Sequence, residues 1–143
     1  MTKDPGHIPD MAELALRSAA EFVVSEVNTR LDNGDIEGAL ELYAEDAVLE
    51  SVQGRDAIRQ TIMHTAAAGR GRKACHVVSN FRGYVEGNTV VMDTTQIAFL
   101  IDGPPPWPAN SVLLLVRYVL KPSSDGKLRI VEQRVPGYKL NHG

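Results

Sequence analysis

Apolar residues in the first quarter of the chain recur at the three- and four-residue spacing of an amphipathic helix. The stripe consists of Met11, Ala15, Ala19, Phe22, Val23, Val27 and Leu31. Pro9-Asp10 followed by Glu13 resembles a capping box before the stripe, and Gly34 stands where a C-terminal glycine is expected. Asp35 then provides the N-cap of a short second helix. That helix carries Ile36, Ala39, Leu40 and Tyr43. We therefore predict a helical hairpin.

The rest of the chain predicts a short strand, a third helix and then four strands. Residues 47–51 form the short strand, and Arg55 to about Ala67 carries an apolar stripe of helical period. From Ala74 onward, β-branched and aromatic runs are separated by Gly87-Asn88, a proline-rich loop and Asp125-Gly126. Three helices followed by an antiparallel meander predict the α+β class.

Size and composition agree with a single domain at residues 1–143, whose core we place at about 10–136. A chain of 143 residues is long enough to bury one core, and 43% hydrophobic with 23% charged residues is ordinary for a globular protein. No apolar run approaches the roughly 18 residues of a membrane span. The first ten residues lack the apolar segment of a signal peptide. We therefore expect a cytoplasmic protein without a membrane partner.

Charge and ligand chemistry argue against several partners and cofactors. The net charge of −3 and the pI near 5.8 give no general attraction for nucleic acid, so we expect none as a partner. Cys75 is the only cysteine, which excludes an internal disulfide and agrees with a reducing compartment. The four histidines are scattered without metal-ligand spacing, and no phosphate-binding or dinucleotide motif is present. We therefore predict neither a metal nor another cofactor.

The hairpin around Gly87-Asn88 brings polar chemistry onto an apolar strand face. Pairing Glu86 with Thr89 sets Arg82 opposite Asp93, Asn80 opposite Thr95, Val78 opposite Ile97 and His76 opposite Phe99. Because side chains alternate, His76, Val78 and Asn80 project from one face, with Phe99 beside His76. An apolar wall with one imidazole and one amide is typical of a pocket for a small organic ligand. A buried structural histidine remains the alternative.

The chain resembles the SnoaL-like branch of the nuclear transport factor 2-like superfamily over residues 10 to 136. The resemblance is carried, in this order and spacing, by RLDNGDIEGALELYAEDAVLE, GRDAIRQ, CHVVSN and the two long strands ending in GKLRIVEQRV. It implies a cystatin-like cone, in which three N-terminal helices pack on a strongly curved, mixed and mostly antiparallel sheet around a pocket. It also implies a homodimer formed through the outer face of the sheet.

By the same resemblance, Asp32 and His76 are the candidate catalytic residues. Dehydratase relatives have a carboxylate at the end of the long helix and a histidine at the start of an H-x-x-x-N strand, and the two meet in the pocket. A carboxylate fixes the imidazole tautomer and leaves the other nitrogen free to move a proton. The chain departs from its relatives at Val27, where they carry a carbonyl-polarising aromatic residue. It also departs at Ser51, where ketosteroid isomerases carry their general base, so that mechanism is not expected.

Further side chains are expected to bind the substrate. They are Phe22, Tyr43, Asn80, Phe99, Trp107 and Tyr118. Asn80 would hydrogen-bond a substrate oxygen, while Tyr43 equally fits the core of the helical hairpin. The loop 103–108, which holds Trp107, would either cover the pocket or pack in a dimer interface.

The resulting hypothesis is a cofactor-free lyase or isomerase of dehydratase or cyclase type. Its substrate would be a small apolar or hydroxylated cyclic molecule of polyketide, steroid or terpene character. Two alternatives stay open, a non-catalytic module for ligand binding or dimerisation and a small subunit of a larger oxygenase. A fold by itself does not decide among them, because one fold hosts many functions.

Overall fold

The computed structural model describes residues 4–104 and 111–140. The elements follow in the order α1 (Met11–Asp32), α2 (Ile36–Leu40), β1 (Tyr43–Leu49), β2 (Val52–Gln53), α3 (Arg55–Ala68), β3 (Lys73–Glu86), β4 (Thr89–Ile101), β5 (Ser111–Pro122) and β6 (Leu128–Leu140). One sheet has the strand order β2-β1-β6-β5-β4-β3. β1 and β6 run parallel, and the other neighbours run antiparallel. The α+β class with a mixed, mostly antiparallel sheet is therefore confirmed.

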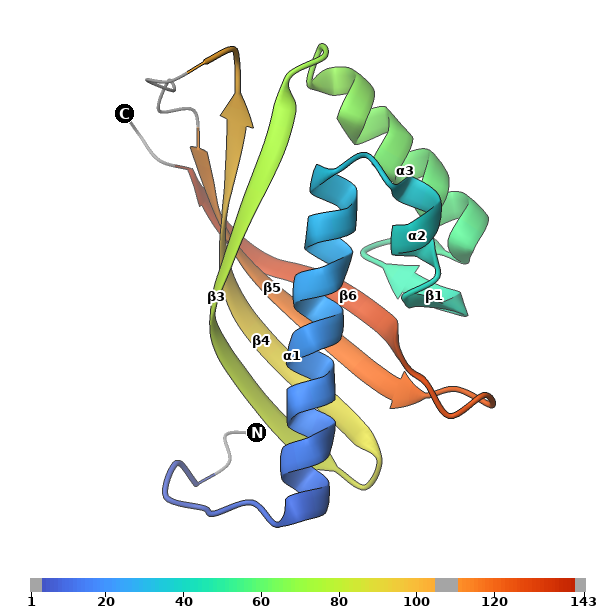
Figure 1. The fold of residues 1–143 in the computed structure, drawn as a ribbon, viewed down its shortest axis with the longest axis vertical. Coiled ribbons are helices and arrows are strands. Elements are labelled where there is room, and N and C mark those ends of the chain that lie inside the picture. Colours follow the sequence, from blue (N-terminus) through green and yellow to red (C-terminus); the bar gives the residue numbers. More distant parts are fainter. Residues whose placement is uncertain (1–3, 105–110, 141–143) are drawn as a thin grey trace.

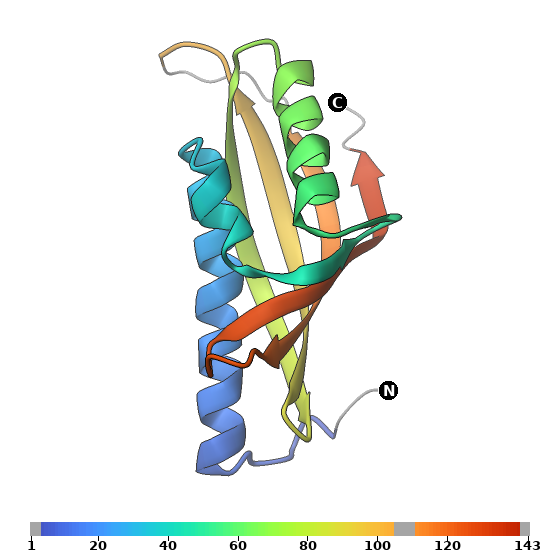
Figure 2. The same cartoon turned by 90° about the vertical axis from the view of Figure 1, so that its right-hand side faces the viewer.

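The long helix α1 crosses one face of the twisted sheet, which we call the inner face (Figure 1). It packs on β3, β4 and β6, whereas α3 packs on α2 and the short strands β1 and β2. The turned view shows residues 4–10 leading from the start of α1 toward the opposite side, which we call the outer face (Figure 2). This arrangement places the C-terminal end of α1 beside the first half of β3.

The hydrophobic core lies between α1 and the inner face. The helix buries Ala20, Val23, Val24 and Val27 there. The sheet contributes Tyr43, Met92, Tyr118, Leu120 and Ile130, all fully buried. Each fully buried side chain of this kind contributes roughly 1.5–3 kcal/mol to folding. The packing of α1 therefore fixes where its last residue stands relative to the sheet.

The predicted caps set the ends of the first two helices. The Asp10 carboxylate accepts a hydrogen bond from the Glu13 amide at 2.8 Å, and α1 ends at Asp32 with Asn33 as its C-cap. The Asp35 carboxylate accepts from the Gly38 amide at 3.0 Å and begins α2. Because α1 ends at this turn, Asp32 occupies the last helical position.

Tyr43 corrects the boundary expected for the second helix. That helix ends at Leu40, and Tyr43 begins β1, where it pairs with Ile130. The Arg55 guanidinium donates two hydrogen bonds, of 3.0 and 2.7 Å, to the Tyr43 carbonyl. Pairing with β6 and these long-range bonds override the local helical spacing, and the strand begins four residues before the predicted start at Ala47.

Candidate functional site

The carboxylate of Asp32 and the imidazole of His76 meet where α1 ends beside β3. Asp32 Oδ1 lies 2.6 Å from His76 Nδ1, and Asp32 Oδ2 accepts a hydrogen bond of 2.7 Å from the His76 backbone amide. Both side chains are largely enclosed, with 15% of Asp32 and 21% of His76 exposed. The two candidate catalytic residues, which are 44 positions apart in the chain, are therefore brought together.

This geometry determines which ring nitrogen is available for chemistry. An ionised carboxylate only accepts hydrogen bonds, so Nδ1 carries the proton and Nε2 of a neutral ring is left as the base. In the described part of the chain, Nε2 has no hydrogen-bond partner. The arrangement can accept a proton and stabilise the resulting charge.

A β-bulge corrects the expected pairing between β3 and β4. Arg82 lies opposite Asp93 as predicted, but the register shifts between Ser79 and Arg82, and His76 lies opposite Ala98. Asn80 is the extra residue, with a left-handed φ of 52°. Asparagine tolerates this conformation better than most residues. Because one residue is inserted, each residue of β3 from Lys73 to Ser79 pairs with β4 one position away from its expected partner.

The bulge removes two predicted residues from the neighbourhood of His76. Phe99 pairs with Cys75, and therefore lies on the sheet face opposite to His76. Asn80 is exposed and lines a pocket on the outer face. His76 and Val78 keep the inner orientation, since His76 reaches Asp32 and Val78 packs against the core. The shared face of His76 and Asn80 was thus a wrong expectation, because alternation does not continue through a bulge.

Tyr118 belongs to a buried polar network rather than to an apolar wall. Its hydroxyl accepts hydrogen bonds from Gln96 Nε2 at 2.8 Å and from Asn28 Nδ2 at 3.3 Å. Gln96 Nε2 also donates to Thr94 Oγ1 at 3.1 Å. Burial raises the pKa of Tyr118, and the bonds from Asn28 and Gln96 act in the opposite direction. Sequence reasoning missed this network, although Asn28 is a polar residue within the apolar stripe of α1.

The remaining predicted residues lie in different surroundings. Tyr43 is fully buried, and its hydroxyl donates to Gln133 Oε1 at 2.5 Å. Burial raises the pKa of this phenol. Phe22 is 68% exposed and lies outside the core. Trp107, with most of the loop 103–108, lies outside the described residues.

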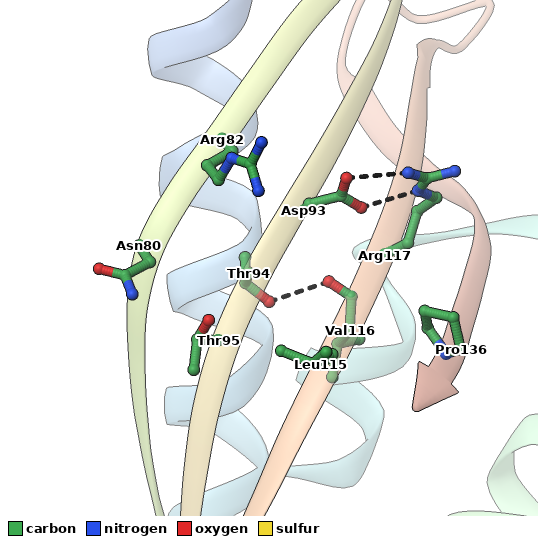
Figure 3. Close-up of a pocket in the computed structure, with 9 residues that line it drawn as sticks. All are labelled: Asn80, Arg82, Asp93, Thr94, Thr95, Leu115, Val116, Arg117 and Pro136. Carbon is green, nitrogen blue, oxygen red and sulfur yellow. Dashed lines mark hydrogen bonds and ion pairs between the residues drawn. The ribbon is translucent and has the colours of Figure 1, made fainter. Parts of the chain in front are cut away.

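Two surface hollows lie away from the Asp32 and His76 pair. The first, which we call the outer pocket, has a volume of about 190 Å³ and is shown in Figure 3. It is lined by Asn80, Arg82, Asp93, Thr94, Thr95, Leu115, Val116, Arg117 and Pro136. The second, of about 360 Å³, lies between the N-terminal residues, α1 and β3, and it shares Arg82, Asp93 and Arg117 with the outer pocket. Neither hollow includes Asp32 or His76.

Within residues 4–104 and 111–140, no group of three or more histidine, cysteine, aspartate or glutamate side chains is arranged to hold a metal ion. No helix in these ranges combines the length and apolar character needed to span a bilayer.

Solved structures with the same architecture share little sequence with this chain. Aln2 from a Streptomyces species is 16% identical with a TM-score of 0.77, covering 90% of this chain and 93% of that chain. ActVI-ORFA from Streptomyces coelicolor is 16% identical with a TM-score of 0.69, covering 84% and 95%. An NTF2-like protein with a cystatin-like fold from Novosphingobium aromaticivorans is 21% identical with a TM-score of 0.66, covering 96% and 94%. At these identities the likeness shows the fold alone.

The sequence itself identifies the family. No curated protein matches the chain significantly. The profile of the SnoaL-like domain, however, matches residues 12–134, which include both Asp32 and His76. The helices and mixed sheet agree with the NTF2-like, cystatin-like fold of the structural relatives. The chain therefore belongs to the SnoaL-like domain family.

Proposed function

We propose that the chain is a cofactor-free lyase or isomerase, of dehydratase or cyclase type, in which His76 transfers protons and Asp32 holds it in place. The observation that carries the proposal is the double contact of one carboxylate, which binds both Nδ1 and the backbone amide of His76. These two bonds fix the position and the tautomer of the ring, leaving Nε2 for proton transfer. Within this role Asp32 is a positioning residue.

The surroundings of His76 support a small, largely apolar substrate. Ala98 lies opposite His76, and Val112 lies opposite Ala98, so small apolar residues of β4 and β5 extend from His76 across the inner face. Ala98, Leu100, Val112 and Leu114 all keep part of their surface exposed. An apolar surface beside a single polar pair suits a cyclic molecule of polyketide, steroid or terpene character.

The proposed reaction needs one group that takes and returns a proton. In a dehydration, Nε2 removes a proton from a carbon, the electrons of that C–H bond form a C=C bond, and the C–O bond of a neighbouring hydroxyl breaks. The departing oxygen takes the proton back from the imidazolium and leaves as water. In an isomerisation, the same proton returns to a different carbon. Asp32 stabilises the cationic ring between the two transfers.

The test is turnover of hydroxylated cyclic ketones, followed as loss of water by mass spectrometry. His76→Ala should lower kcat by about a hundredfold or more, since the general base is removed. Asp32→Asn keeps the side-chain shape but presents an amide to Nδ1, which forces the proton onto Nε2. This variant should lower kcat with little change in KM.

His64→Ala is the matched control, because His64 is an exposed histidine on α3 and should leave turnover unchanged. If His76→Ala keeps the wild-type rate on a substrate that the wild type converts, the proton-transfer role of His76 is wrong.

One observation favours a second candidate, a non-catalytic ligand-binding module. The bond of 2.7 Å from the His76 amide to the Asp32 carboxylate ties α1 to β3, which is a structural role that needs no catalysis. This alternative predicts that apolar cyclic ligands raise Tm without being converted. Asp32→Asn would then lower stability but change no chemistry.

We also propose that the chain acts as a cytoplasmic homodimer. Support for pairing comes from the outer face, where Val77, Ile97 and Leu113 lie opposite one another on three strands and Val77 is 47% exposed. Sedimentation of wild type and Val77→Asp tests the dimer, because a charge in an apolar interface should dissociate the two copies.

The cytoplasmic location rests on the use of a single cysteine, Cys75, as a free thiol.

A further inference from the structure

The outer pocket is a hollow that the proposed reaction does not use. It lies on the face of the sheet away from α1 (Figure 3), next along the strands to the apolar row of Val77, Ile97 and Leu113. Two strands bulge at its level. β3 bulges at Asn80, and the register of β6 against β5 shifts between Leu115 and Arg117. Bulges on both sides of the regular β4–β5 pair leave a depression between them, and bulges are frequent beside functional sites.

The charged side chains of the outer pocket leave one positive charge unbalanced. Arg117 binds Asp93 with two hydrogen bonds, of 2.7 and 2.9 Å. Those bonds, with a further contribution from the charge of Arg82, hold the pKa of Asp93 below its ordinary value, so this carboxylate is ionised at neutral pH. Arg82 makes no hydrogen bond or direct ion pair with any residue in the described part of the chain. Within the lining of the outer pocket, two guanidinium groups therefore face a single carboxylate, while Asp4 and Glu13 line the adjoining second hollow, which Arg82 also borders.

Polar and apolar groups complete the lining. Thr95 and Asn80, which carry a hydroxyl and an amide, line the same hollow as the two arginines. Leu115, which is 41% exposed, and Pro136 add an apolar side. A site with an excess guanidinium, neutral hydrogen-bonding groups and an apolar wall matches an anion attached to an apolar body.

We propose that the outer pocket binds a small organic carboxylate, whose anionic group contacts the guanidinium groups of Arg82 and Arg117 and whose apolar body lies against Leu115 and Pro136. Planar guanidinium groups bind carboxylates with paired hydrogen bonds, and Arg82 is free to do so. The volume of about 190 Å³ restricts the ligand to a small molecule. This site goes beyond the proposed function and does not depend on Asp32 or His76.

The experiment is a titration of the chain with benzoate, followed by amide chemical shifts. Shifts should gather at Asn80, Arg82, Thr95 and Arg117. Benzyl alcohol, which has a similar shape without the charge, should bind much more weakly. Arg82→Gln should raise the Kd for benzoate by at least about tenfold, because a charge-assisted hydrogen bond is lost. Asp93→Asn removes the carboxylate from the lining and should lower the Kd.

Arg134→Gln is the matched control, since Arg134 is an exposed arginine that is paired with Glu132 and does not line the pocket. It should bind benzoate as the wild type does. Equal affinity for benzyl alcohol, or an unchanged Kd in Arg82→Gln, would overturn the proposal. So would shifts at the lining residues that follow protein concentration rather than benzoate, because the proposed dimer would then cover the pocket as well as the apolar row beside it.

Discussion

Replacing Tyr118 with phenylalanine should destabilise the chain through two buried amides that lose a partner. The Tyr118 hydroxyl accepts from Asn28 Nδ2 and from Gln96 Nε2, and all three residues are buried. Phenylalanine keeps the ring and its packing. The variant therefore removes one oxygen atom from the network and leaves the apolar core in place.

The expected loss follows from the bonds that remain. Asn28 keeps its bond of 2.9 Å to the Val24 carbonyl, and Gln96 keeps its bond of 3.1 Å to Thr94. Each amide then has one N–H that points at a ring carbon, and a buried donor without a partner costs about 1–3 kcal/mol. Because the bond from Asn28 to Tyr118 is long, at 3.3 Å, we expect a total loss of about 2–4 kcal/mol in the free energy of unfolding.

Urea unfolding of Tyr118→Phe, followed by circular dichroism, measures this loss as a lower midpoint with an unchanged slope. Tyr84→Phe is the control, because the Tyr84 hydroxyl has no hydrogen bond within the described residues. It should stay within about 0.5 kcal/mol of the wild type. The double variant Tyr118→Phe with Gln96→Leu should lose less than the sum of the single changes. A single-variant loss below about 0.5 kcal/mol, or strict additivity, would refute the reasoning.

Two further predictions concern packing and pH. A Cβ at Gly83 would lie 2.6 Å from Cε of the fully buried Met92, so Gly83→Ala should cost about 1–3 kcal/mol by overpacking. An unchanged urea midpoint would show that Met92 moves aside freely. Burial raises the pKa of both Tyr43 and Tyr118 above the ordinary value of 10.0. An unfolded tyrosine loses its proton near pH 10 while the buried one keeps it, so stability is complete below that pH. Above it, stability falls by up to about 1.4 kcal/mol per pH unit for each phenol. Urea midpoints measured from about pH 9 to 11 should show this fall, and Tyr43→Phe should make it shallower.

The resemblance located the candidate catalytic pair, whereas the faces of two expected substrate-binding residues depended on a strand pairing that the sequence did not show. Asp32 and His76 are in contact as the resemblance implied, and their catalytic role stays a prediction. Phe99 and Asn80 were assigned to the wrong face, because strict alternation was assumed through residue 80. An inserted residue has no periodic signal of its own. The left-handed φ of Asn80 becomes evident only when both strands are paired.

Residues close together in the sequence were enough to determine the cap of α1 and the tight turn between β3 and β4. Asp10 caps α1 as its spacing to Glu13 indicated. The Gly87-Asn88 turn pairs Glu86 with Thr89, with Gly87 at a left-handed φ of 63°. These features need only a few consecutive residues, because caps and tight turns bond groups that are two to four positions apart.

Tertiary structure decided every feature that depends on partners far away in the chain. Tyr43 joined β1 because β6 and Arg55 hold it there. Asn28, Gln96 and Tyr118 form one network because α1 lies across the inner face. The outer pocket exists because two strands, separated by most of the sheet sequence, bulge at the same level. Sequence periodicity records which side of an element is apolar, but the residues that meet across elements are set by packing and register.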